Sequence, residues 1–79
     1  MDIHHLVTMA NQIGKFFETS TDPDAAVKGI ARHLQNFWDP RMRRQIVAYA
    51  SKNGGRGLDE PVKRAILMLA AEEAERTSA

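Results

Sequence analysis

An aspartate recurs at each point where a helix is expected to begin, and this pattern constrains the fold more than any other feature of the chain. Aspartate is a good helix N-cap because its side-chain oxygen accepts a hydrogen bond from a free backbone N–H of the first turn. Two of these aspartates are followed directly by proline, which suits the first helical position because the N–H that it lacks has no partner there. The predicted caps are Asp2, Asp22, Asp39 and Asp59.

Apolar residues follow each cap at the i, i+3, i+4 and i+7 spacing of one helical face. We expect helices at about residues 3–19, 23–37, 40–53 and 60–75, with Gly54 and Gly55 ending the third, Gly57 keeping the next loop flexible, and residues 76–79 frayed. No segment alternates with the period of a strand. The prediction is an all-α fold, a small four-helix domain with short loops that covers residues 1–79. The residues expected to face its core are Ile3, Leu6, Val7, Ala10, Ile13, Gly14 and Phe17; Val27, Ile30, Ala31, Leu34 and Phe37, with Trp38; Met42, Ile46, Tyr49 and Ala50; and Val62, Ala65, Ile66, Leu69 and Ala70.

The composition excludes several functional classes. The chain has 79 residues, a net charge of +1 and no cysteine. Thiolate metal sites, iron–sulfur ligation and disulfides are therefore excluded, and there is no overall electrostatic attraction to nucleic acid or to an anionic membrane. The first residues lack the pattern of a signal peptide, and no apolar run approaches the roughly 18 residues of a membrane span. We expect a soluble cytoplasmic protein.

Two of the predicted helices carry more apolar surface than one face requires. Met9 and Phe16 lie just outside the main stripe of the first helix, and Leu67, Ala71 and Ala74 lie away from that of the fourth. One interpretation is that these two helices are central and contact two neighbours each. The other is that part of this surface is buried only in a complex, either with a partner or with a second copy of the chain.

Three arginines stand at the unfavourable end of the third predicted helix. Arg41, Arg43 and Arg44 fall in its first turn, where the macrodipole is positive and each cation costs a few tenths of a kcal/mol to about 1 kcal/mol. Four explanations are open: pairing with acids of the fourth helix, exposure to water, an acidic partner surface, and a nucleotide phosphate or nucleic acid. The adjacent Trp38 is either a core residue or an interface anchor.

Catalytic and metal-binding arrangements are not recognisable. His4 and His5 are adjacent and point about 100° apart on a helix, which does not suit joint metal ligation, and no histidine pair has i, i+4 spacing. Ser20, Thr21 and Ser51 have no nearby histidine or lysine arrangement that indicates an activated nucleophile, and the GGRG segment lacks the lysine and spacing of a phosphate-binding loop. We expect no catalytic, cofactor-binding or metal-binding residue in the chain.

Three blocks resemble the delta subunit of NAD-dependent, molybdenum-containing formate dehydrogenases. They are LVTMANQIGKFF, HLQNFWDPRMRRQI and GGRGLDEPVKRAI, at residues 6–17, 33–46 and 54–66, and together they cover about half of the chain. The second block is the most specific. One departure is Glu60, which separates Asp59 from Pro61 where the family pattern has Asp-Pro directly.

The resemblance implies an accessory subunit that carries no redox centre of its own. The complex would contain a large formate-oxidising subunit with a molybdopterin guanine dinucleotide and iron–sulfur clusters, together with subunits that handle FMN and NAD. The delta-like chain would dock on the large subunit in a hetero-oligomer and support assembly, stability or cofactor retention. The residues predicted to contact the partner are Trp38, Asp39, Pro40, Arg41, Arg43 and Arg44, with Asn11, Gln12 and Phe16.

Two other functions remain open from the sequence. One is a nucleic-acid-binding module with the third helix as its recognition helix, although the near-zero net charge and the acidic fourth helix are unusual for such a domain. The other is a chaperone that binds the guanine nucleotide part of the cofactor while the cofactor is inserted.

Overall fold

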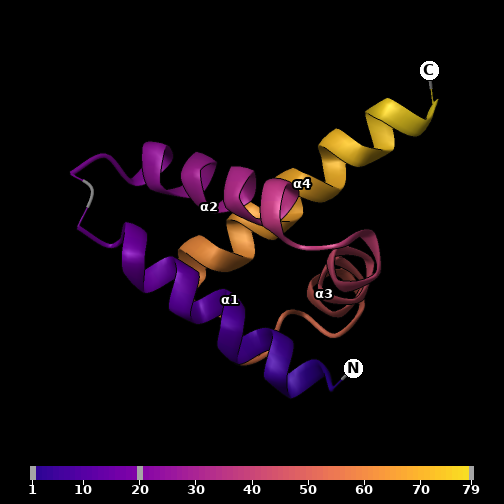
Figure 1. The fold of residues 1–79 in the computed structure, drawn as a ribbon, viewed down its shortest axis with the longest axis horizontal. Coiled ribbons are helices and arrows are strands. Elements are labelled where there is room, and N and C mark those ends of the chain that lie inside the picture. The colour runs from indigo at the N-terminus through magenta and orange to yellow at the C-terminus, as the bar shows by residue number, and fades with distance from the viewer. Residues whose placement is uncertain (1, 20, 79) are drawn as a thin grey trace.

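The computed structural model describes residues 2–19 and 21–78, with side chains up to residue 75. It contains α1 (Ile3–Phe17), α2 (Pro23–Phe37), α3 (Pro40–Lys52) and α4 (Glu60–Ser78), and no strand among the described residues. The all-α prediction is confirmed. Figure 1 shows α1 and α2 running in opposite directions, with α4 behind them and α3 viewed almost end-on near the N-terminus.

The aspartates begin the helices as predicted. Oδ1 of Asp2 accepts from the N–H of His4 at 3.1 Å, and Oδ1 of Asp22 accepts from the N–H of Asp24 at 3.0 Å. Asp39 caps α3 by accepting from the N–H of Met42 at 3.0 Å. At α4 the carbonyl of Asp59 accepts from the N–H of Lys63 at 2.9 Å, which places Asp59 at the N-cap position.

Two helix ends differ from the sequence prediction. α1 ends at Phe17 and not near residue 19, because the chain turns there toward the cap of α2. α4 continues to Ser78 where a frayed tail was expected from residue 76. The extension consists of arginine, threonine and serine and contains neither glycine nor proline, so no residue in it opposes the helix strongly.

The core draws its side chains from all four helices. Both α1 and α4 pack against each of the other three, so these two helices are central, and they contact more neighbours than the two expected for each. The fully buried large side chains are Leu6, Val27, Ile30, Leu34, Ile46, Val62, Ile66 and Leu69. Each of them was predicted to face the core. Phe37 was also placed in the core, and this prediction is wrong, because its side chain is 73% exposed.

Two glycines allow α1 to approach its neighbours closely. A Cβ atom on Gly14 would overlap the side chain of Val62 on α4, and one on Gly29 would overlap the ring of Phe17. Gly14 was predicted on the core face of α1, and the structure shows that its lack of a side chain leaves room for Val62.

The loop between α3 and α4 is held at several points and does not have the freedom expected from its glycines. Gly54, Gly55 and Gly57 all have positive φ, a conformation that costs L-residues energy. The N–H of Leu58 donates to the carbonyl of Gly55 at 3.0 Å, and the hydroxyl of Tyr49 donates to the carbonyl of Arg56.

Within the described residues, no helix combines the length and apolar character needed to cross a membrane.

Replacing Gly14 with alanine should lower the melting temperature. Overpacking against Val62 costs about 1–3 kcal/mol, whereas the better helix propensity of alanine returns at most about 1 kcal/mol. In a Val62→Ala background the overlap is removed, so the same replacement should leave stability unchanged or raise it. Thermal unfolding of the four variants, followed by circular dichroism, measures this coupling. A Gly14→Ala variant that is more stable than the parent chain would contradict the close packing of α1 and α4.

Candidate docking surface

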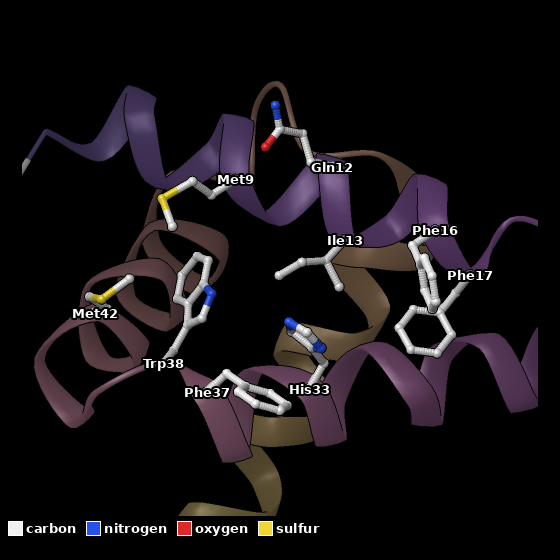
Figure 2. A pocket seen from close by; sticks show the side chains of 9 residues that line it. All are labelled: Met9, Gln12, Ile13, Phe16, Phe17, His33, Phe37, Trp38 and Met42. Atoms are coloured by element: carbon white, nitrogen blue, oxygen red, sulfur yellow. The ribbon is translucent and has the colours of Figure 1, made fainter.

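An apolar groove of about 490 Å³ lies between α1 and α2 and reaches the start of α3. Figure 2 shows the side chains that line it, with Met9 and Met42 toward one end and Phe16 and Phe17 toward the other. No lining side chain carries a permanent charge. The lining residues are Met9, Gln12, Ile13, Phe16 and Phe17 of α1, His33 and Phe37 of α2, Trp38, and Met42 of α3.

Two phenylalanines on opposite walls of the groove face solvent. Phe16 is 76% exposed and Phe37 is 73% exposed. Each ring contacts one neighbour: Phe16 meets Phe17 edge-on at a centroid distance of 5.1 Å, and Phe37 lies 4.7 Å from the ring of His33. Exposed aromatic rings gathered around one groove are typical of a surface that another molecule covers. The exposure of Phe16 agrees with its predicted position outside the main stripe of the first helix, whereas the exposure of Phe37 was missed.

Trp38 explains why Phe37 points outward. Trp38 follows the last residue of α2 with extended backbone angles (φ −88°, ψ 139°) and turns its ring into the protein, where it is only 5% exposed. Two large rings at adjacent positions cannot both enter the same side of the core, and the doublet was the signal available in the sequence. Of the two interpretations of Trp38, the core residue is the one the structure shows, and its ring forms part of the groove lining.

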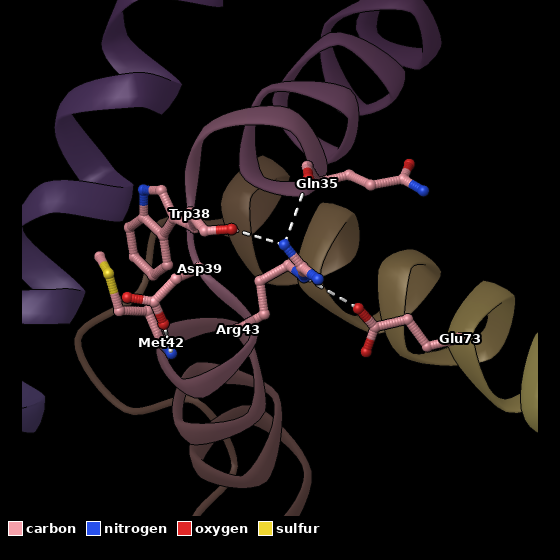
Figure 3. A network of polar contacts seen from close by, with 6 residues as sticks. All are labelled: Gln35, Trp38, Asp39, Met42, Arg43 and Glu73. Carbon is pink, nitrogen blue, oxygen red and sulfur yellow. Dashed lines mark hydrogen bonds and ion pairs between the residues drawn. The ribbon is translucent and has the colours of Figure 1, made fainter.

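Arg43 is bound inside the molecule. Figure 3 shows its guanidinium between α2 and α4: Nε donates to Oε1 of Glu73 at 3.0 Å, and Nη1 donates to the carbonyl of Gln35 at 3.2 Å and to the carbonyl of Trp38. These carbonyls belong to the C-terminal end of α2, where backbone acceptors lack helical partners and the macrodipole is negative. The poor position of Arg43 at the start of α3 is therefore compensated by the end of α2. Pairing with an acid of α4 is the correct interpretation for this arginine.

Arg41 and Arg44 differ from Arg43. Both are exposed, and the side chain of neither forms a hydrogen bond or an ion pair within the part of the chain that the structure describes. They stand three positions apart and therefore lie on neighbouring parts of the helix surface. Asp39 and Pro40, which precede them, are also exposed, although the carboxylate of Asp39 is used as the cap of α3.

Asn11 and Gln12 were predicted together, but the structure separates them. The amide of Asn11 reaches across to the α3–α4 loop, where Nδ2 donates to the carbonyl of Gly57 at 2.9 Å and Oδ1 accepts from the N–H of Asp59 at 3.0 Å. Asn11 therefore fastens this loop to α1. Gln12 is exposed and lines the groove.

The remaining candidates are weaker. Leu67, on α4, is 41% exposed, and Ala71 and Ala74 on the same helix are also exposed. These three residues form a second apolar area, which contains no aromatic ring. His4 and His5 are exposed, and the described residues contain no group of three or more side chains that would hold a metal ion.

The features described define a small helical protein with an open apolar groove and two exposed arginines in the first turn of α3. The family model of the NADH-dependent formate dehydrogenase delta subunit, FdsD, matches residues 5–66. The chain belongs to this family, and the resemblance found in the sequence is confirmed. The match does not support the nucleic-acid-binding alternative. Neither the comparison with curated proteins nor the comparison with solved structures finds a match.

Asn11→Ala should destabilise the free chain. The change removes both hydrogen bonds to the α3–α4 loop and should cost about 1–3 kcal/mol, because the carbonyl of Gly57 and the N–H of Asp59 lose their partners. Gln12→Ala is the matched control, since it is the adjacent residue and is exposed. Urea unfolding of both variants measures the difference. Equal stability of the two would mean that the loop does not depend on Asn11.

Arg43→Ala should also lower the free energy of unfolding, by about 1–3 kcal/mol, because the orphan carbonyls at the end of α2 and the carboxylate of Glu73 lose a charged donor. The Arg41→Ala and Arg44→Ala double variant should keep or slightly raise the melting temperature, since it removes two cations from the positive end of α3. Thermal unfolding of the two proteins side by side is the measurement. A larger loss for the double variant would show that these arginines also have partners inside the fold.

Proposed function

We propose that this chain is a non-catalytic accessory subunit of a cytoplasmic NAD-dependent formate dehydrogenase complex, and that it docks through the α1–α2 groove onto the large molybdenum-containing subunit. The observation that carries the proposal is the pair of exposed rings on opposite walls of this groove, Phe16 and Phe37. Membership of the delta subunit family is the reason for proposing a formate dehydrogenase complex. The groove is the surface that we propose for docking.

The energetics favour a partner over solvent. Full burial of a phenylalanine side chain contributes about 1.5–3 kcal/mol, and roughly three-quarters of that gain is still available at Phe16 and at Phe37. A four-helix protein of this length has a small core, so a ligand that binds only the folded state also raises its stability. Docking would therefore stabilise both proteins of the complex.

The cofactors of the complex are proposed for the other subunits. The chain has no cysteine to ligate an iron–sulfur cluster. The molybdopterin guanine dinucleotide and the clusters would belong to the large subunit, with FMN and NAD on further subunits. The role that we assign to this chain is support of assembly, stability or cofactor retention in that large subunit.

The docking surface that we propose is narrower than the set predicted from the sequence. It retains Phe16, Gln12, Arg41 and Arg44, with Asp39 and Pro40 beside them, and gains Phe37. Arg43 and Asn11 are left out because their polar groups are engaged within the chain, and Trp38 supports the groove from inside.

The test is purification of the native complex with a tagged variant of this chain. Replacing Phe16 and Phe37 together with serine should reduce recovery of the large subunit, and the molybdenum that accompanies it, by about tenfold or more, because two exposed anchors are lost. The melting temperature of the free chain should change little, since neither ring is in the core.

Leu67→Ser is the matched control, because it removes an exposed apolar side chain on α4 outside the groove. It should leave recovery of the large subunit unchanged. The proposal fails if the phenylalanine variant recovers the complex as well as the parent chain does, or if Leu67→Ser is the variant that loses it.

A further inference from the structure

Asn53 caps the C-terminal end of α3 and is followed directly by a glycine. Both Asn53 and Gly54 are exposed, and neither lines the groove. The side-chain amide of an asparagine can be attacked by the backbone nitrogen of the next residue. Glycine favours this reaction because no Cβ atom crowds the attacking nitrogen and because its backbone rotates freely. The pair is therefore a candidate for chemical modification, separate from the proposed docking surface.

The backbone nitrogen of Gly54 is not engaged elsewhere. The N–H groups on either side of it both donate to the carbonyl of Tyr49, from Asn53 at 3.0 Å and from Gly55 at 3.3 Å. The N–H of Gly54 itself forms no hydrogen bond within the described part of the chain. A Cβ atom at Gly54 would meet nothing within 4 Å, so the space beside it is open. Attack by this nitrogen breaks no hydrogen bond of its own.

The fold opposes the attack only weakly. Ring closure requires rotation about ψ of Asn53, which is 9° in the folded chain. This rotation moves the following peptide and releases the bond from Gly55 to Tyr49, which at 3.3 Å is longer than the usual range of about 2.7–3.2 Å. The stronger contacts of the loop, at residues 56–59, lie beyond the rotating peptide. Local openings of this kind at a helix end need less free energy than global unfolding.

The two other asparagines of the chain differ from Asn53. Asn11 and Asn36 lie inside α1 and α2, and the residues that follow them are Gln12 and Phe37. The backbone nitrogen next to each of them is part of a helical turn, where its N–H donates to the carbonyl four residues before it. The amide of Asn11 is also bound to the α3–α4 loop. Asn53 is thus the asparagine whose neighbouring nitrogen the fold leaves free.

We propose that Asn53 is a site of spontaneous deamidation in the folded protein, with water as the co-reactant. The nitrogen of Gly54 gives its proton to a base in solution and forms a bond to the side-chain carbonyl carbon of Asn53. The bond from that carbon to the amide nitrogen breaks, and the leaving group takes up a proton and departs as ammonia. Water then opens the five-membered imide at either of its carbonyls, which leaves aspartate or isoaspartate at this position.

The products change the end of α3. Each adds a carboxylate where the macrodipole of the helix is negative, and each lowers the net charge of the chain from +1 to zero. Isoaspartate also adds one carbon to the backbone at the start of the α3–α4 loop. We expect both products to have a lower melting temperature than the parent chain. The site is independent of the proposed docking function, because its chemistry needs no partner.

Peptide mapping by mass spectrometry measures the reaction in the full folded chain. After incubation in mildly alkaline buffer, the amide of Asn53 should be lost, and the peptide that contains it should separate into an aspartate and an isoaspartate form. The peptides with Asn11 and Asn36 should keep their amides. In mildly acidic buffer the loss should be slower, because the attacking nitrogen must first give up its proton.

Asn53→Gln is the matched variant, because the same attack would have to close a larger and slower-forming ring. It should keep the amide at this position during the same incubation. A parallel incubation in urea gives the rate for the unfolded chain. Two results would contradict the proposal: a folded chain that keeps the amide of Asn53 while the chain in urea loses it, and formation of aspartate without isoaspartate. The first would mean that the fold protects the site, and the second that water attacks the amide directly.

Discussion

Arg43 joins three helices at one point, and the shape of the molecule at the groove depends on this contact. A cation at the start of a helix is unfavourable, but the guanidinium of Arg43 is compensated because it donates to the carbonyls of Gln35 and Trp38 at the end of α2. The carboxylate of Glu73 completes the site from α4. An unfavourable interaction with the dipole of α3 is thus exchanged for a favourable one with the dipole of α2. These contacts connect the turn between α2 and α3 to α4.

The held junction determines which side chains face solvent. With the carbonyl of Trp38 bound to Arg43, the ring of Trp38 enters the core while Phe37 remains outside it. Close packing of α1 contributes the opposite wall, because Gly14 lets α1 approach Val62 and Gly29 accommodates the ring of Phe17. The exposed Phe16 then faces the groove across from Phe37. The contacts of Arg43 and the two glycines, Gly14 and Gly29, thus shape the apolar groove, although none of these three residues lines it.

The three arginines at the start of α3 differ in whether they contact other parts of the fold. One cation of the cluster, Arg43, is bound within the fold, and the two others are exposed on α3. Residues that break a local rule without compensation inside the molecule are expected at functional surfaces. In the proposed docking function, apolar burial would contribute affinity and exposed charge would contribute to the choice of partner.

The sequence by itself determined the helices and most of the core. Caps such as Asp22 and Asp39 act on their own first turn, and the spacing of Leu6, Ile30 and Ile66 marks the buried face of each helix, so both are local properties that a single sequence carries. The family resemblance was also present in the sequence. The end of α4 was misjudged because helix ends depend on weak local preferences.

Only the tertiary structure decided which predicted partner residues are free to bind. Asn11 and Gln12 are adjacent and both polar, yet one closes the α3–α4 loop and the other lines the groove. Arg43 is distinguished from Arg41 and Arg44 by which helix end lies opposite it, and Phe37 is distinguished from Trp38 by the turn that follows α2. These outcomes depend on contacts between residues far apart in the chain, such as positions 11 and 59 or 43 and 73, and local periodicity contains no information about which distant group will satisfy a hydrogen bond.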